Sequence, residues 1–308
     1  MYRIVHAFFY ALSLLPFWVL YRLSDCGFVL MYYIVRYRRG VVRRNLRTSF
    51  PDYSDSQIRS AERGFYRWFC DYFIEAVKLL SISDRQLRRR FQIEGIDEVE
   101  RRFAQGRDCA AILGHYCNWE WLSCVGIALP QDRVMGLIYH PLRSPVFDRL
   151  FRDLRSSQPT SMCVPKAEIL RRLVTLRKEG RRSLFGYIAD QGPKWQNIHL
   201  WLDFLGHETP VFTGAERIMR RMDNAVFYVS MTRPRRGYYT CRFRLLSEHP
   251  AEEEEFAVTR RFFEWLEDDI RREPRYYLWS HNRWKRTREE FDRLFTTING
   301  KIVRRPED

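Results

Sequence analysis

The stretch that decides the fold is Ala110-Ala111-Ile112-Leu113-Gly114-His115-Tyr116-Cys117-Asn118-Trp119-Glu120-Trp121. The apolar run Cys109–Leu113 is typical of a buried strand, and Gly114 ends it. Asn118 is a good N-cap for a helix that continues to Ala128. The pattern therefore predicts a strand, a turn and a helix, with His115 at the carboxyl end of the strand. Open α/β sheets bind their ligands at this edge.

His115 and Glu120 are the first candidates for catalysis. Across the predicted turn, Glu120 is expected to reach one ring nitrogen of His115 and fix its tautomer, which leaves the other nitrogen free to take a proton from an alcohol. A histidine and a glutamate at this spacing are also compatible with two unrelated polar residues near a helix start. Because they flank a turn between a predicted strand and a predicted helix, a general-base pair is an equal alternative, and the rest of the chain must decide between the two.

The rest of the body alternates predicted strands with predicted helices. Residues 133–139 and 183–189 read as buried strands, and residues 145–154 and 167–178 read as helices between them. This alternation predicts an α/β fold with a mainly parallel central sheet flanked by helices. We expect the segment after Phe295 (residues 296–308) to be a loosely ordered tail.

The amino-terminal segment is predicted to anchor the chain in a membrane. Residues 4–21 are apolar apart from His6 and Ser13, and a second apolar run covers residues 26–35. Eighteen residues is just long enough for a spanning helix. Six arginines follow with no acidic residue among them: Arg36, Arg38, Arg39, Arg43, Arg44 and Arg47. We therefore expect the body of the protein on the cytoplasmic side, with these arginines bound to anionic lipid head groups. A buried core helix with a solvated basic tail is the alternative. Residues 1–50 would form the anchor and residues 51–295 the catalytic domain.

Composition points to an anionic partner. The chain has 53 Lys and Arg against 38 Asp and Glu, and 16% of its residues are aromatic. Such a balance is typical of proteins that bind nucleic acid, an anionic membrane surface or phosphorylated substrates. The seven cysteines are odd in number and show no metal-binding spacing, which indicates reduced thiols.

Further candidate residues follow other predicted strands. Asp190 and Gln191 come directly after the predicted strand 183–189, although an ordinary Asx turn would also explain them. Arg155 and Lys166 lie in a basic region that is compatible with a solvated surface. Motifs for a serine nucleophile, a nucleotide phosphate or a metal are absent from the sequence, so neither a cofactor nor a metal is expected.

Taken together, these pieces resemble the late acyltransferases of lipid A biosynthesis, within the lysophospholipid and glycerolipid acyltransferase group. The resemblance covers about residues 1–290. The matching segments are Asn45-Leu46-Arg47-Thr48-Ser49-Phe50-Pro51, His115 with Glu120, Ser144-Pro145-Val146-Phe147-Asp148 with Arg155, Asp190-Gln191, Phe204-Leu205-Gly206, Thr213-Gly214 and Trp279-Ser280-His281-Asn282-Arg283-Trp284-Lys285. Lys166 matches only loosely. The Glu-Gly-Thr-Arg block of glycerol-phosphate members is missing, which disfavours a phosphatidate-forming enzyme.

The resemblance implies an O-acyltransferase at the cytoplasmic face of the inner membrane. His115 and Glu120 would form a general-base dyad that activates a hydroxyl of a lipid A precursor, a phosphorylated glycolipid. The donor would be an acyl thioester, on acyl carrier protein or coenzyme A. Arg155, Lys166, Asp190 and Gln191 would bind substrate, and nucleic acid would not be a partner.

Two alternatives stay open. In the first alternative, the chain is an acyltransferase whose acceptor is a lysophospholipid or an amino-acid lipid. In the second, the chain is a membrane-tethered basic protein that binds nucleic acid or anionic lipid without catalysis. The second explains the charge but not why His115 and Asp190 both follow predicted strands.

Overall fold

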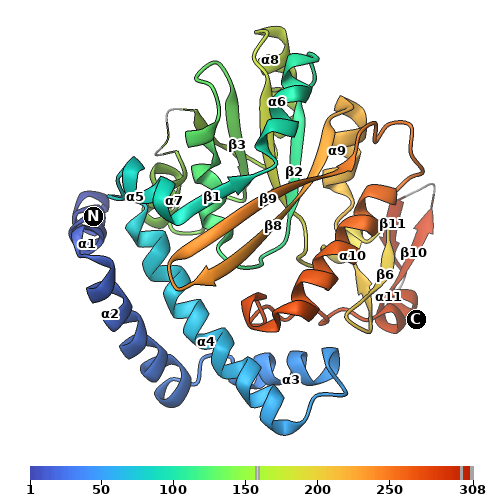
Figure 1. Ribbon diagram of the computed structural model, residues 1–308. Helices are drawn as coiled ribbons and strands as arrows, with labels where there is room; N and C mark the ends of the chain where they lie inside the picture. Colours follow the sequence, from blue (N-terminus) through green and yellow to red (C-terminus); the bar gives the residue numbers. More distant parts are fainter. Residues whose placement is uncertain (157, 159, 299–300, 306–308) are drawn as a thin grey trace.

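The computed structural model describes residues 1–156, 158, 160–298 and 301–305. Across these residues a seven-stranded sheet has the order β1-β9-β8-β2-β5-β3-β4 (Figure 1). The strands are β1 (Phe91–Glu94), β2 (Cys109–Leu113), β3 (Val134–Tyr139), β4 (Ser161–Pro165), β5 (Ser183–Ile188), β8 (Ala225–Arg235) and β9 (Tyr238–Ser247). All neighbouring strands pair in parallel except the hairpin β8–β9. The predicted mainly parallel α/β sheet is therefore confirmed, with β9 and β1 running against the other strands.

Helices flank this sheet, and three of them, α7, α8 and α9, connect strands that run in parallel. They are α4 (Asp55–Lys78), α5 (Asp84–Arg90), α6 (Ile96–Ala104), α7 (Pro145–Arg155), α8 (Ile169–Lys178), α9 (Gly214–Met222), α10 (Ala257–Arg272) and α11 (Arg288–Leu294). The short 3₁₀ helices η3 (Trp195–Asn197) and η4 (Pro274–Tyr276) lie in connections. Ser54 opens α4 with a capping box, because its side chain accepts from the backbone of Gln57 while the Gln57 side chain accepts from the Ser54 backbone.

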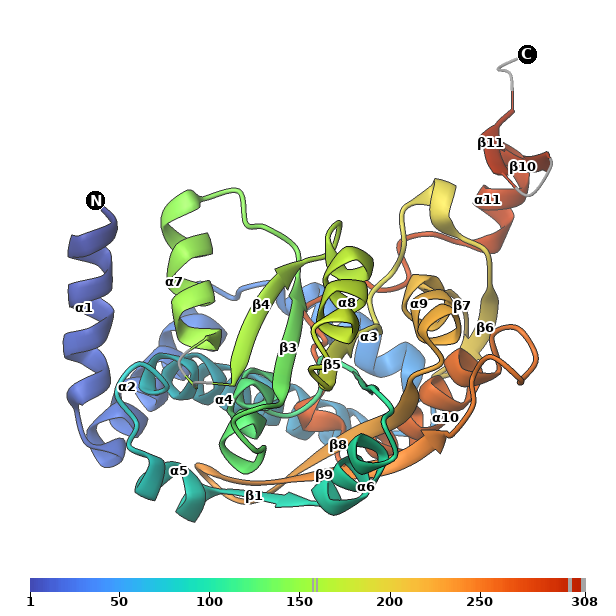
Figure 2. The same ribbon diagram turned by 90° about the horizontal axis from the view of Figure 1, so that it is seen from above.

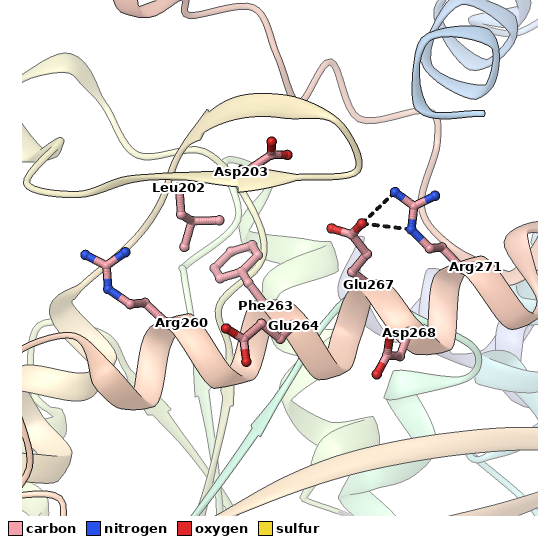
Figure 3. A pocket seen from close by; sticks show the side chains of 8 residues that line it. All are labelled: Leu202, Asp203, Arg260, Phe263, Glu264, Glu267, Asp268 and Arg271. Atoms are coloured by element: carbon pink, nitrogen blue, oxygen red, sulfur yellow. Dashed lines mark hydrogen bonds and ion pairs between the residues drawn. The ribbon is translucent and has the colours of Figure 1, made fainter. Parts of the chain in front are cut away.

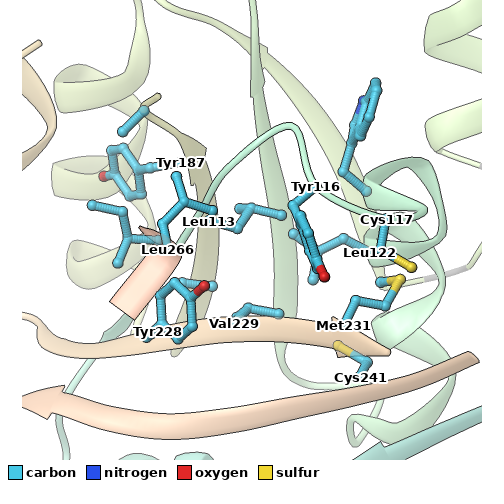
Figure 4. Close-up of a cluster of buried hydrophobic side chains, with 14 of the residues drawn as sticks. Leu113, Tyr116, Cys117, Leu122, Tyr187, Tyr228, Val229, Met231, Cys241 and Leu266 are labelled. Atoms are coloured by element: carbon cyan, nitrogen blue, oxygen red, sulfur yellow. The ribbon is translucent and has the colours of Figure 1, made fainter. Parts of the chain in front are cut away.

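The core lies under the His115 turn. The part of it drawn in Figure 4 has side chains from β2, β5, β8 and β9, from the turn, from the helical segment Trp119–Ala128 after it and from α10, and they include Leu113, Tyr116, Cys117, Leu122, Tyr187, Tyr228, Val229, Met231, Cys241 and Leu266. Gly114 lies against α10 so closely that a Cβ there would be 2.8 Å from two Leu266 methyl carbons. The chain therefore leaves β2 at a point where a larger residue would force the Leu266 side chain to move.

Two regions differ from the sequence-based expectation. The segment Trp119–Ala128 is a 3₁₀ helix (η2) rather than an α-helix, and the Asn118 side chain does not cap it. Asn118 instead donates to the buried Glu75 at 2.7 Å. The expected loose tail contains an antiparallel hairpin, β10 (Phe295–Ile298) with β11 (Lys301–Arg304), which projects beyond α11 (Figure 2). The predicted tail residues 299–300 and 306–308 lie outside the described residues.

The amino-terminal helices lie along α4 at the border of the molecule (Figure 1). They are α1 (Tyr2–Leu14) and α2 (Phe17–Val29), which continues as the π-helical turn η1 (Leu30–Ile34). Pro16 cannot continue a helix, and the axis bends there by 113°. Within the part of the chain that the structure describes, neither segment alone has both the length and the apolar character needed to cross a bilayer, although the bent pair together reaches them. The predicted spanning helix is thus not a single continuous element.

Most of the six predicted membrane arginines bind within the protein instead. Arg39 and Arg43 both hold the fully buried Glu62, at 2.7 Å each. These two lie on α3 (Arg39–Ser49), which packs on α4. Because a buried carboxylate needs a partner, Arg39 and Arg43 stabilise the fold, and their guanidinium groups are already engaged within the protein.

A small two-stranded sheet, β6 (Trp201–Phe204) with β7 (His207–Pro210), completes the fold.

Candidate active site

His115 and Asp190 meet because two neighbouring parallel strands end at the same level. Strand β2 pairs with β5, with Leu113 opposite Ile188, and each functional residue follows two positions later. The amide of Ala189 donates to the Leu113 carbonyl and keeps the two strand ends together. As a result His115 Nδ1 lies 2.7 Å from Asp190 Oδ1. The predicted placement of both residues at the carboxyl edge of the sheet is confirmed.

Asp190 is a buried carboxylate that remains ionised. Its side chain is 2% exposed. Burial alone would raise the pKa of Asp190, but the adjacent His115, and to a lesser extent Arg283, outweigh this and hold it below its ordinary value. An ionised Asp190 requires that His115 donate from Nδ1, which leaves the lone pair on Nε2.

Gln191 faces the other ring nitrogen. Its amide nitrogen lies 3.2 Å from His115 Nε2, so with Nδ1 protonated the amide donates to the Nε2 lone pair. Asp190 and Gln191, the second and third residues after β5, therefore hold both nitrogens of the imidazole. The edge of the ring also contacts Trp119 (centroids 5.1 Å apart), which fixes the ring plane.

The backbone around His115 is fixed by the segment Tyr276–Arg283. The Leu278 amide donates to the His115 carbonyl at 3.1 Å, and the Cys117 amide donates to the Tyr276 carbonyl at 2.8 Å. Cys117 has a φ of 53°, a left-handed conformation that costs a non-glycine residue about 1 kcal/mol. These bonds hold the sharp turn that presents the His115 side chain.

Glu120 does not orient His115, which corrects the sequence-based expectation. Its carboxylate accepts from Arg155 Nε at 2.8 Å and Nη2 at 2.5 Å, and from the Tyr72 hydroxyl at 3.1 Å. Arg155, on α7, binds both oxygens of the buried Glu120 carboxylate, and such bidentate pairs are strong. Asp190 occupies the place beside His115 that we expected Glu120 to take.

The predicted site residues therefore form two groups. One contains His115, Asp190 and Gln191, and the other contains Glu120 and Arg155. The groups are joined through Trp119, whose ring contacts both His115 and Tyr72 (4.3 Å between the Trp119 and Tyr72 centroids). Lys166 joins neither group in the described contacts, because its ammonium lies over the Phe212 ring at 4.7 Å.

Two residues near Asp190 were missed as site residues. Arg283 is 2% exposed and donates to the Pro210 carbonyl, and its Nη1 and Nε have no partner among the described residues. His281 precedes it, and burial lowers the pKa of His281 to about 4. Both belong to the matched segment Trp279–Lys285. From the sequence alone, a basic residue among aromatic residues is equally compatible with a position on the protein surface. Their proximity depends on tertiary folding.

Other places in the fold offer less. A surface pocket between β6 and α10 is lined by four carboxylates, two arginines, Leu202 and Phe263 (Figure 3). None of the predicted site residues lines it. Within the described residues, no group of three or more histidine, cysteine or acidic side chains is placed to hold a metal ion.

Comparison with known proteins adds an independent finding. Residues 1–286 match the family model described as bacterial lipid A biosynthesis acyltransferase. The chain is also similar to the lipid A biosynthesis palmitoleoyltransferase of Escherichia coli (strain K12), with 23% identity over 259 residues, 80% of this chain and 79% of that protein. The lipid A biosynthesis acyltransferase of Shigella flexneri matches with the same identity and coverage.

Proposed function

Because this chain belongs to the bacterial lipid A biosynthesis acyltransferase family, we propose that it transfers a fatty acyl chain from a thioester to a hydroxyl of a lipid A precursor. The observation that carries the proposal is the 2.7 Å contact between His115 and the buried Asp190. A histidine held by an ionised carboxylate at the carboxyl edge of the sheet is equipped to take a proton from an alcohol. Residues 51–295 would form the catalytic domain.

The proposed reaction needs a base but no protein nucleophile, since a thioester is already activated. His115 Nε2 takes the proton of the acceptor hydroxyl while the hydroxyl oxygen bonds to the acyl carbon. The carbon–sulfur bond then breaks, and the imidazolium returns the proton to the departing sulfur. Asp190 stabilises the imidazolium in between, in the way that a buried carboxylate does in acyl-transfer triads.

Gln191 and the Glu120–Arg155 pair receive separate roles in the proposal. The acceptor hydroxyl takes the position at His115 Nε2 where the Gln191 amide now lies, and the displaced amide is then a donor for the developing oxyanion. Glu120 fixes Arg155 by two of its five N–H donors. The remaining donors would bind a phosphate of the acceptor. Lys166 remains a proposed substrate contact, for which the described contacts offer no support.

The donor and the location are also part of the proposal. Acyl carrier protein or coenzyme A is the expected carrier, and a net charge of +15 suits the anionic character of either donor and of a phosphorylated glycolipid. Large apolar side chains exposed on α1 and α2, including Ile4, Phe8 and Trp18, support attachment to a membrane. The proposed location is the inner membrane, with the catalytic domain in the cytoplasm.

The experiment is complementation of a strain that lacks this gene, with lipid A analysed by mass spectrometry. The wild-type chain is expected to restore one acyl group on lipid A, and His115→Ala is expected to leave it absent at equal protein level. An unchanged lipid A with an altered phospholipid or amino-acid lipid would assign the acceptor to that class. Full restoration by His115→Ala would refute the proposed base.

A further inference from the structure

The amide side chain of Asn45 joins the amino-terminal part of the chain to the segment behind the candidate site. Asn45 lies on α3 and is 3% exposed. Its Nδ2 donates to the Trp279 carbonyl at 2.9 Å and to the His281 carbonyl at 3.0 Å. Both N–H groups of one amide thus end on two carbonyls of a single loop, which fixes the loop relative to the helix.

Neighbouring residues of the same part of the chain reinforce this contact. Arg38 Nη1 donates to the Ser280 carbonyl at 3.0 Å, and Arg44 Nη2 donates to Asn282 Oδ1 at 3.2 Å. The Phe50 ring contacts the edge of Trp279, with centroids 5.9 Å apart. In Figure 1, α3 lies beside the lower end of α4, below the strands of the sheet. The contacts therefore connect a peripheral helix with an internal loop.

That loop is the one that fixes His115. Immediately before the Asn45 contacts, Leu278 donates to the His115 carbonyl and Tyr276 accepts from Cys117. Immediately after them, Arg283 lies beside the residues that follow Asp190, because a Cβ on Gly192 would be 3.2 Å from Arg283 Nη1. A change in the loop would therefore move two things at once. One is the turn that carries His115, and the other is Arg283, the cation near Asp190.

We propose that Asn45 is a positioning residue for the His115–Asp190 pair, acting through the loop Tyr276–Arg283. The proposal rests on the proposed function of His115. It assigns α3 a role beyond membrane attachment, because one buried amide holds the loop whose backbone fixes the catalytic turn. Loss of that amide removes a donor from two carbonyls and lets the loop shift. A displacement of about 1 Å at a catalytic group can reduce turnover about 10²-fold.

The test compares Asn45→Ala and Asn45→Asp with two controls. Arg47→Ala changes an exposed residue of the same helix that pairs with Asp55, and Leu173→Ala is a buried change in α8 that lowers stability at a distance. Purified full-length proteins are assayed for kcat and KM with an acyl thioester and a lipid A precursor. Hydrogen–deuterium exchange is followed in peptides that contain the amides of Cys117 and Leu278.

Both Asn45 variants are expected to lose roughly 10- to 100-fold in kcat while KM stays within about threefold. Asn45→Asp should lose more, because a carboxylate faces the two carbonyls. Exchange should quicken at Cys117 and Leu278 in both, and in neither control. Equal kcat losses in Asn45→Ala and a Leu173→Ala protein of the same melting temperature, or unchanged exchange at both amides, would overturn the inference. If His115→Ala keeps its activity, the proposed function is wrong. The hydrogen–deuterium exchange result would still show whether Asn45 holds the loop.

Discussion

Replacing Asp190 by asparagine removes the charge that faces His115 and leaves the size of the side chain unchanged. In the wild-type structure Nδ1 lies 2.7 Å from Asp190 Oδ1. The charges of an imidazolium and this carboxylate would then be centred about 4 Å apart, where their attraction is roughly 4 kcal/mol at an effective dielectric constant near 20. Loss of this attraction in the transition state corresponds to about a 10³-fold decrease in kcat.

The tautomer of His115 adds to this loss. The asparagine amide can donate to Nδ1, which would put the ring proton on Nε2 and remove the lone pair needed by a general base. We therefore expect a decrease of about 10³- to 10⁴-fold in kcat for Asp190→Asn.

The assay is steady-state acyl transfer by purified protein with a radiolabelled thioester donor and a lipid A precursor. Asp203→Asn is the matched control, because it makes the same substitution at an exposed carboxylate of β6. Its kcat should stay within about twofold of wild type. An Asp190→Asn protein that retains kcat within tenfold of wild type would refute the reasoning, as would an Asp190→Asn loss that the Asp203→Asn control reproduces.

Three further predictions concern the pair beside the site, acidification and the amino-terminal helices. Arg155→Met should lower the free energy of unfolding by about 3 kcal/mol, because the Glu120 carboxylate, 2% exposed, loses its bidentate partner; thermal denaturation should show partial recovery in Arg155→Met with Glu120→Gln. The pKa of His281 lies near 4 in the folded protein, so between its ordinary value of about 6.5 and pH 4 the unfolded state binds the extra proton. The free energy of unfolding should then fall by about 3 kcal/mol as the pH decreases across this window, and urea titrations should show a smaller fall for His281→Gln. Trp18→Glu should weaken flotation with anionic vesicles about tenfold or more, because it places a charge on an exposed apolar face.

Each of these predictions has an outcome that contradicts it. Equal melting temperatures for Arg155→Met and wild type would show that the ion pair contributes no net stability. A pH dependence that is identical in His281→Gln would place the acid-sensitive group elsewhere. Wild-type protein recovered at full length in a high-salt supernatant without detergent would contradict membrane attachment.

Local sequence patterns were sufficient for most of the fold. Apolar runs of five or six residues gave β2 and β5. The pattern failed at Trp119–Ala128, because the Asn118 side chain bonds to Glu75 of a distant helix rather than to the backbone of η2. It also failed at β10 and β11, which pair antiparallel although each strand is only four residues long.

The site was predictable in its members but not in its pairing. His115 and Asp190 each follow a strand, and the register of two parallel strands brings them together. Glu120 is closer in sequence, yet Arg155, 35 residues further on, holds its carboxylate. Nearness along the chain therefore gave the wrong partner for His115. Arg283 helps to lower the pKa of Asp190. Its position depends on a loop that is held by tertiary contacts, so no spacing in the sequence predicts it.

The most direct test of the central claim is the turnover of purified His115→Ala beside wild type, with a thioester donor and a lipid A precursor in the same assay. If His115 is the general base, kcat should fall by about 10²- to 10⁴-fold while circular dichroism and the melting temperature stay close to those of wild type. A folded His115→Ala protein with turnover within tenfold of wild type would contradict the account.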